Sequence, residues 1–372
     1  MMFKKIADQV SRFFVSGLFI FSGLIKLNDP IGTRIKMEEY FSVFADDFGS
    51  FFDLFIPLAL EIGMIMIILE LVLGVAVLIY YRMKVTTILL LLLMVFFTFL
   101  TFYSAYFNKV TDCGCFGDAI KLTPWQSFFK DVILMFPVLH LFWYRKTYVP
   151  LLRTREGHLV VGVATAICLA LGIYAIRHLP FIDFRAYRIG NHIPTQMQPE
   201  EQPIFEYVFI RQDDGEQVRS EKYLMDTTQF KYHSVVQLNE EKTRPKITDY
   251  AVTSVEGEDV TQQTFEGIKL FFVIYDVSKA AEKNMEQIVQ LSRELEGKVD
   301  MMVLTASGAT QFEAFRHEHQ LAVPYYYADA TVLKTIVRSN PGITVWVDGT
   351  VKGMWHHNDT PEAGEILALV QL

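Results

Sequence analysis

Long apolar stretches dominate the first half of the chain, and polar residues dominate the second half. A helix that crosses a membrane needs about 20 mostly apolar residues. Five stretches fit this pattern to different degrees, at residues 13–27, 54–81, 85–107, 125–144 and 159–176. The third and fifth contain no charged residue, whereas the fourth carries Lys130 and Asp131 near its start and Pro137 inside it. We therefore predict an α-helical membrane bundle of about five transmembrane helices.

Basic residues in the short flanks indicate how these helices are oriented, because cytoplasmic flanks carry an excess of Lys and Arg. If all five segments span, three basic flanks fall on one side. Their basic residues are Lys4, Lys5, Arg12, Arg82, Lys84, Arg145, Lys146, Arg153 and Arg155. We predict that this side is the cytoplasm, and that everything after Ile176 lies in the periplasm, outside a cell inner membrane. The start also fits a signal peptide, but no small-residue cleavage site follows, so we expect a retained first helix.

The second half reads as a soluble region in which strands and helices alternate. Residues 205–211 alternate like a strand, within a connector marked by several prolines. Further on we expect a hairpin over 250–264, strands at 269–275, 299–305, 343–347 and 351–355, and helices at 279–295, 310–319, 331–336 and 362–369. Asp348 and Gly349, between the last two strands, favour a tight hairpin. This order of elements predicts an α/β layer fold.

The pattern divides the chain into four parts. We predict a four-helix bundle at 1–146, a fifth transmembrane helix with its flanks at 147–180, a strand-rich connector at 181–246 and an α/β domain at 247–372.

Composition changes this picture in two respects. The net charge of -8 argues against nucleic acid as a partner, because phosphate binding needs a positive face. The chain has only three cysteines, too few for a disulfide-stapled fold. We expect membrane lipid and an exported or membrane protein as partners.

The most specific local feature is a Cys-Gly-Cys loop, Asp112-Cys113-Gly114-Cys115-Phe116-Gly117-Asp118. It lies at the predicted outer mouth of the bundle, where an oxidising compartment favours disulfides. A disulfide between Cys113 and Cys115 closes a very small ring, so we expect it to be strained and easily reduced. Two alternatives remain, a static clip on a loop and two ligands of a metal site. Because an acid raises the pKa of a neighbouring thiol, Asp112 favours a pair that accepts electrons.

Two acids and one cysteine lie within hydrophobic segments. An acid within the membrane is costly and therefore suggests function, and Glu70 lies nearer mid-segment than Glu61. Glu70 is thus a candidate for a proton or polar-ligand role, and the alternative is that it pairs with Lys26 and only orders the bundle. Cys168 sits near the middle of the fifth stretch, where a cysteine usually packs as a small apolar residue.

The first part of the chain resembles a known family of membrane proteins. The resemblance rests on Ser16-Gly17, on Phe21-Ser22-Gly23-Leu24-Ile25-Lys26-Leu27-Asn28-Asp29-Pro30, on Leu69-Glu70-Leu71-Val72-Leu73-Gly74 and on the Cys-Gly-Cys loop. These residues are similar to those of the DoxX-like and methylamine-utilisation-protein-E-like family of four-helix membrane proteins. The resemblance covers residues up to about 146. It implies a role in periplasmic disulfide formation or in maturation of partner proteins, and a bundle similar to that of vitamin K epoxide reductase.

The last part resembles the thioredoxin fold of periplasmic thiol oxidoreductases. The string Ser339-Asn340-Pro341-Gly342-Ile343-Thr344-Val345-Trp346-Val347-Asp348-Gly349-Thr350-Val351 is similar to the segment that contains the cis-proline of that fold. Pro341 would be this proline. Where the family carries Cys-x-x-Cys, this chain has Asp276-Val277-Ser278-Lys279-Ala280. No cysteine follows Cys168, so we expect a domain that cannot exchange disulfides itself.

Three functions remain open at this point. In the first, the chain is a membrane thiol/disulfide oxidoreductase in which Cys113 and Cys115 take electrons from a partner and pass them to a quinone in the bundle. In the second, it is a non-catalytic scaffold or assembly protein whose outer domain docks a partner. The third, a transporter that uses Glu61 or Glu70, is disfavoured because the helices show no internal repeat.

Overall fold

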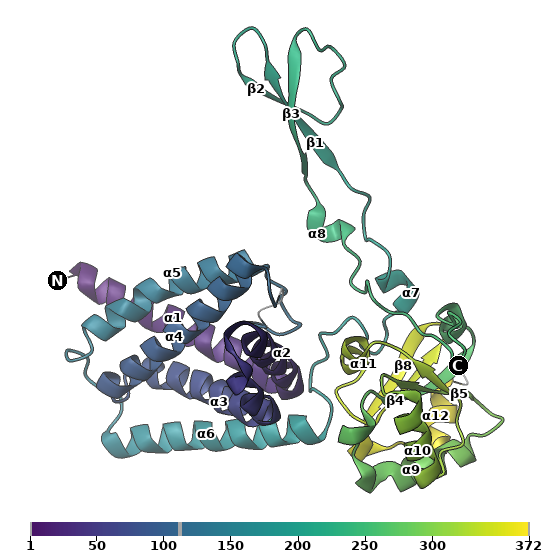
Figure 1. Cartoon of the computed structure of the whole chain (residues 1–372). Coiled ribbons are helices and arrows are strands. Elements are labelled where there is room, and N and C mark those ends of the chain that lie inside the picture. Colours follow the sequence, from purple (N-terminus) through teal and green to yellow (C-terminus); the bar gives the residue numbers. More distant parts are fainter. Residues whose placement is uncertain (1, 111–113, 371–372) are drawn as a thin grey trace. The chain divides into compact units, whose positions relative to one another are not determined.

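The computed structural model divides the chain into two compact units, residues 1–185 and 186–372. It describes residues 2–110 and 114–370. Figure 1 labels the elements of both units.

The first unit is a helical bundle. Its elements are α1 (Met2–Asn28), α2 (Pro30–Phe48), the 3-10 helix η1 (Ser50–Leu58), α3 (Ala59–Leu78), α4 (Met83–Phe107), α5 (Pro124–Trp143) and α6 (Thr154–Arg177). Four helical segments are long and apolar enough to cross a membrane, namely Phe3–Asn28, Ser50–Leu78, Met83–Phe107 and Thr154–Arg177. The chain is therefore a multi-pass membrane protein. All five predicted helices form, but α5 does not reach the same apolar composition, and its crossing of the membrane stays a prediction.

Small residues allow α1 and α3 to pack closely in this bundle. A Cβ atom at Gly74 would lie 2.9 Å from Ile20 Cγ1, and one at Gly23 would lie 2.5 Å from Leu71 Cγ. Close approach through glycine is typical of helices that associate within a membrane. Helix α5 packs on α4 and α1, whereas α6 packs on α3 and α1 (Figure 1).

Helix α2 was not predicted from the sequence. Asp29 caps its start by accepting a hydrogen bond from the Gly32 amide at 2.8 Å, and Pro30 occupies the first helical position. Both are standard signals for the start of a helix. α2 carries Phe41 and Phe44, which pack against the aromatic residues of η1, so it covers one side of the bundle.

The second unit contains a thioredoxin-like α/β domain. Its elements are η2 (Gln262–Phe265), β4 (Ile268–Ile274), η3 (Val277–Lys279), η4 (Glu282–Asn284), α9 (Met285–Glu294), β5 (Asp300–Thr305), α10 (Ala309–His319), β6 (Tyr325–Tyr327), α11 (Ala330–Ile336), β7 (Gly342–Val347), β8 (Thr350–His356), η5 (His357–Asp359) and α12 (Ala363–Val370). The strand order is β6-β5-β4-β7-β8. Strands β5 and β6 run parallel to β4, β7 runs antiparallel to β4, and β8 runs antiparallel to β7. The bond between Asn340 and Pro341 is cis, as predicted.

Both faces of this sheet are covered. Leu270 and Phe272 of β4 pack in one cluster with residues of α9, α10 and α12. On the other face, Phe271 contacts Trp346 edge to face, and Trp346 stacks on Phe265. Burial of these aromatic rings gives the domain its own core.

Three predictions for this domain need correction. The helix expected over 279–295 begins at Met285, because Ala281 donates its amide to the Asn340 carbonyl at 2.9 Å and the chain before it forms only 3-10 turns. The hairpin expected over 250–264 is reduced to an isolated bridge between Thr253 and Asp259. The short strand β6 was not predicted, since three residues are too few for a periodic pattern.

The tight hairpin between β7 and β8 forms as predicted. Asp348 and Gly349 both have positive φ, at 45° and 71°. A two-residue hairpin turn of this kind needs such angles.

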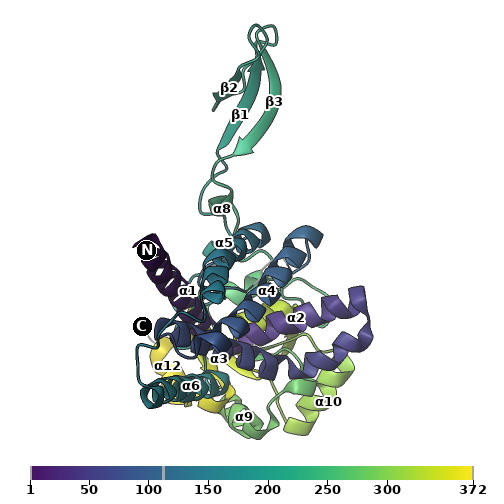
Figure 2. The same ribbon diagram turned by 90° about the vertical axis from the view of Figure 1, so that its left-hand side faces the viewer.

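A separate small sheet forms the connector, together with the short helices α7 (Ile193–Gln196) and α8 (Glu240–Thr243). Strand β1 (Phe205–Arg211) lies between β2 (Gln217–Ser220) and β3 (Phe230–Gln237), as Figure 2 shows. Phe209 is its buried centre, contacted by the rings of Tyr223 and Tyr232. These three strands lie within the region 181–246, for which strands were predicted.

Candidate functional site

The Cys-Gly-Cys loop lies between α4 and α5, and the structure describes only part of it. Cys113, the first member of the predicted redox pair, falls outside the described residues, as does Asp112. Cys115 is half-buried, and the Ser22 hydroxyl of α1 donates a hydrogen bond to its carbonyl oxygen at 2.8 Å. This bond ties the loop to the bundle at one defined point.

The residues on either side of Cys115 hold the loop in place. Phe116 is buried and packs on Phe21 of α1, with 5.7 Å between ring centroids. Gly114 has a φ of +64°, and a Cβ atom there would lie 3.3 Å from Lys36 Cγ of α2. Any other residue at position 114 would therefore meet both backbone strain and a close contact. Contacts with α1 and α2 therefore fix the backbone around Cys115 on the bundle.

Glu70 lies inside the bundle and is paired. The Lys26 ammonium donates to Glu70 Oε2 at 2.8 Å, and the two side chains are 13% and 5% exposed. Lys26 Nζ also lies 4.8 Å from the centre of the Phe97 ring of α4. This ion pair between Lys26 and Glu70 is the alternative to a proton role for Glu70 that the sequence left open. Lys26 is one helical turn from Ser22 on α1, so the ion pair and the loop share one helix face.

A second buried carboxylate lies in the first half of α5. Asp131 is 2% exposed and accepts a hydrogen bond from the Thr101 hydroxyl of α4 at 3.0 Å. Lys130 Nζ lies 2.8 Å from Asp131 Oδ1 and 5.2 Å from the centre of the Phe116 ring. Neither residue was predicted to be a site residue from the sequence. The usable signal was an ionisable residue in an apolar segment, which points to a site by default.

The first unit holds three kinds of group that could take part in thiol chemistry. A cysteine sits on the bundle, two buried carboxylates lie within it, and each carboxylate has a lysine partner. The Thr101 hydroxyl also donates to the Phe97 carbonyl at 3.0 Å, so the two charge pairs contact neighbouring turns of α4. Such groups can hold or move protons where solvent is excluded.

The other predicted residues lie elsewhere. Cys168 is buried in an apolar cluster with Leu27, Ile67 and Leu71, and Glu61 is exposed in the first turn of α3. Among residues 2–110 and 114–370, no group of three His, Cys, Asp or Glu side chains could hold a metal ion.

In the thioredoxin-like domain, hydrogen bonds link the position of the missing Cys-x-x-Cys to the cis-proline loop. Asn340 donates its side-chain amide to the Asp276 carbonyl at 2.7 Å. The Ser339 hydroxyl lies 2.9 Å from His357 Nδ1 and accepts the His357 amide at 3.0 Å. Burial lowers the pKa of His357. The loop that begins at Asp276 and the cis-proline loop are therefore joined by a hydrogen bond, and neither loop contains a thiol that could react.

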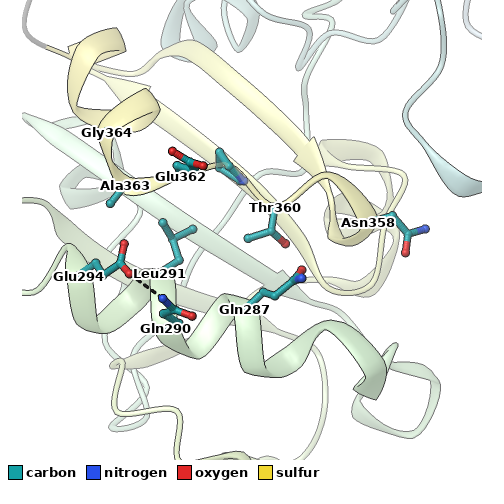
Figure 3. A pocket seen from close by; sticks show the side chains of 10 residues that line it. Gln287, Gln290, Leu291, Glu294, Asn358, Thr360, Glu362, Ala363 and Gly364 are labelled. Carbon is teal, nitrogen blue, oxygen red and sulfur yellow. Dashed lines mark hydrogen bonds between the residues drawn. The ribbon is translucent and has the colours of Figure 1, made fainter.

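An open groove runs beside this region, between α9 and the segment that leads into α12 (Figure 3). Its lining is mainly polar, with Leu291 and Ala363 among its apolar members. Gln290 donates to Glu294 at 2.8 Å along its α9 side. The groove is a surface on which a polar segment could rest.

Comparison with known proteins gives a family model and a curated relative that match parts of the chain. Residues 4–144 match the family model of methylamine utilisation protein MauE. The chain is also similar to protein TlpB of Flavobacterium psychrophilum, with 28% identity over 188 residues, which is 48% of this chain and 47% of that protein. The chain thus spans about half the length of this relative.

Three solved structures are similar to the C-terminal part. They are a secreted disulfide oxidoreductase of Mycobacterium tuberculosis (13% identity, 32% of this chain and 96% of that one), StoA of Bacillus subtilis (11%, 33% and 96%) and a putative thioredoxin of Neisseria meningitidis (12%, 32% and 83%). Each has a TM-score of 0.26. The strand order and the cis-proline, rather than these scores, carry the fold assignment.

Proposed function

We propose that this chain is a membrane thiol/disulfide protein that acts through Cys113 and Cys115. The observation that carries the proposal is that contacts with α1 fix the loop around Cys115. The Ser22 hydroxyl donates to its carbonyl, and its neighbour Phe116 packs on Phe21. Lys130, which pairs with Asp131, lies 5.2 Å from the centre of the Phe116 ring. A loop that served only as a connection would not need these fixed contacts.

The proposed reaction is a disulfide exchange followed by a two-electron transfer. A thiolate of an exported or membrane protein attacks the disulfide between Cys113 and Cys115 and forms a mixed disulfide. The partner's second thiolate then releases a reduced pair and leaves the partner oxidised. A quinone in the membrane would supply the acceptor for the two electrons and two protons that the reduced pair gives up when it returns to the disulfide. Glu70 and Asp131 are the groups within the bundle that would hold protons during this transfer.

The topology required is the one that the basic flanks favour. The N-terminus would lie in the cytoplasm, α5 would complete a fifth crossing, and the thioredoxin-like domain would lie in the periplasm. There it would position the partner while the Cys-Gly-Cys loop supplies the chemistry.

Trapping of mixed disulfides tests this proposal. A Cys115→Ser or Cys113→Ser variant leaves one thiol of the pair, which should accumulate as a covalent complex with the partner after acid quenching and thiol blocking. Cys168→Ser is the matched control, because Cys168 lies in an apolar cluster and should trap nothing. Loss of function in both pair variants, with normal folding, is the expected result. If both variants keep full activity in the native host, the redox proposal fails.

A second function is favoured by a specific observation in the outer domain. Its Cys-x-x-Cys position carries no thiol, and its two facing loops are joined through Asn340, Asp276 and Ala281. A scaffold or assembly protein would need only this docking domain and its membrane anchor. Variants that lack both Cys113 and Cys115 but retain function would favour the scaffold.

A further inference from the structure

Helix α2 holds the segment through which α4 enters the Cys-Gly-Cys loop. Asp47 of α2 accepts a hydrogen bond from Lys109 Nζ at 2.6 Å. The next residue, Val110, is 5% exposed and packs in one cluster with Tyr40 and Phe44 of α2. The segment that leads into the loop is therefore fixed on α2.

The backbone of this segment is held in an unfavourable conformation. Val110 has a φ of +51°, in the left-handed region that branched side chains rarely adopt. A conformation of this kind persists only where the surrounding packing imposes it, and such positions cluster at functional sites. The burial of Val110 against α2 therefore imposes the path that the chain takes into the loop.

Lys36 of α2 lies against the residue between the two cysteines. A Cβ atom at Gly114 would lie 3.3 Å from Lys36 Cγ and 3.8 Å from Lys36 Cβ, so the stem of this lysine packs on the Gly114 backbone. Cys115 follows Gly114 directly, and the Ser22 hydroxyl donates to its carbonyl at 2.8 Å. Because a lysine stem is flexible, the ammonium group can reach the Cys115 thiol by rotation of its own side chain.

The carboxylate that now pairs with Lys36 is exposed. Lys36 Nζ lies 2.9 Å from Glu39 Oε2, one turn further along α2, and the two side chains are 30% and 40% exposed. Ion pairs at this exposure contribute little to stability. Lys36 can therefore exchange Glu39 for a thiolate at small cost.

Three other lysines near the loop are held more firmly by carboxylates: Lys26 by Glu70, Lys130 by Asp131 and Lys109 by both oxygens of Asp47. Glu70 and Asp131 are buried, and either would remain as an uncompensated charge if its lysine turned away. Within the loop, the negative charge of Asp118 opposes a thiolate. Lys36 is therefore the cation that is best placed to act on Cys115.

We propose that Lys36 stabilises the thiolate of Cys115 during disulfide exchange, an inference that rests on the redox function proposed above. When a partner thiolate attacks the Cys113 sulfur, a bond forms between the partner and Cys113. The bond between Cys113 and Cys115 breaks, and its electron pair leaves on the Cys115 sulfur. The Lys36 ammonium neutralises this charge and keeps its proton. A thiol of lower pKa is the better leaving group, so the lysine accelerates the exchange.

Alkylation of a lone Cys115 by iodoacetamide, followed across pH, tests this role. The parent is the full chain in mild detergent with Cys113→Ser and Cys168→Ser, which leaves Cys115 as its only cysteine. Only the thiolate reacts, so the rate below about pH 8 reports the ionised fraction. Lys36→Met should react about five- to tenfold more slowly there, because a nearby opposite charge favours the thiolate. The two rates should converge above about pH 10.5, where the thiol is ionised in both and the lysine loses its charge.

Matched variants separate the charge of Lys36 from its packing. Lys36→Arg keeps a positive charge, so its rate should stay within about twofold of that of the parent. Lys121→Met removes an exposed cation shortly after the loop and should also change the rate less than about twofold. Glu39→Gln releases Lys36 from its present pair and should not slow the reaction.

Equal rates for Lys36→Met and the parent at about pH 7 would overturn the proposal. Equal slowing by Lys36→Arg, or a difference that persists above about pH 10.5, would also overturn it, because either result would indicate altered access to the thiol rather than altered ionisation. Failure of the redox function would look different. Lys36→Met would still slow alkylation, but neither Cys113→Ser nor Cys115→Ser would trap a partner in cells.

Discussion

The buried ion pair between Lys26 and Glu70 gives the sharpest prediction for the bundle. Their charged atoms lie 2.8 Å apart, and the side chains are 13% and 5% exposed. Removing one partner leaves the other charge buried and uncompensated, which costs about 3–5 kcal/mol. We therefore expect Glu70→Met and Lys26→Met each to lower the free energy of unfolding by about this amount.

The double variant should behave differently. When both charges are replaced by methionine, the desolvation penalty of the pair disappears as well, so the change should lie within about 1 kcal/mol of neutral or be stabilising. The sum of the single effects would then exceed the double effect by several kcal/mol, roughly 5 or more, which is the signature of a coupled pair.

Unfolding in mixed micelles of mild detergent and sodium dodecyl sulfate, followed by far-ultraviolet circular dichroism, measures these changes. The exposed pair Lys36–Glu39, with side chains 30% and 40% exposed, is the matched control. Glu39→Gln should cost less than about 1 kcal/mol. Additive single effects, or a Glu70→Met cost as small as that of the control, would refute the buried pair. A double variant that folds but no longer exchanges disulfides would assign the pair a proton role.

Three further predictions follow from the fold. A reporter active only in the cytoplasm should be inactive after residue 372, and activity there would show that α5 does not cross the membrane. Burial lowers the folded-state pKa of His357 below its usual 6.5, so the unfolded chain takes up the proton first as the pH falls. The stability of the folded chain should therefore decrease as pH drops below about 6.5. His357→Asn should remove this effect in pH-dependent melting. Gly349→Ala should lower the free energy of unfolding by about 1–3 kcal/mol in the same assay, because its φ is +71° and a Cβ atom would lie 2.9 Å from Pro194 Cδ. Gly364→Ala is the control and should be nearly neutral, because a Cβ atom there meets nothing within 4 Å.

The membrane helices could be predicted from the sequence because their length and apolar composition are local properties. The expected ranges 85–107 and 159–176 lie within α4 and α6, and α1 extends further back than its apolar core. Helix α2 was missed because its polar and apolar residues alternate without a long apolar run. Asp29 and Pro30 are the local signals for its start.

Contacts between distant segments could not be predicted in the same way. Glu70 required a partner, and Lys26 could be proposed because it was a basic residue near the end of a neighbouring apolar segment. The bond from Thr101 to Asp131 depends on how α4 and α5 pack, which one sequence does not determine. The late start of α9 has the same origin, since Ala281 bonds to Asn340, 59 residues further along the chain.

The redox state of the cysteine pair in intact cells is the direct readout of the proposed disulfide between Cys113 and Cys115. Denatured protein would be labelled with a maleimide large enough to shift its mobility once for each free thiol, with and without prior reduction. The account predicts one label without reductant, on Cys168, and three after reduction, since the chain has three cysteines. It also predicts that the pair becomes reduced when the cell's quinones are depleted. Three labels without reductant in untreated cells, or a pair whose state does not respond to quinone depletion, would contradict the account.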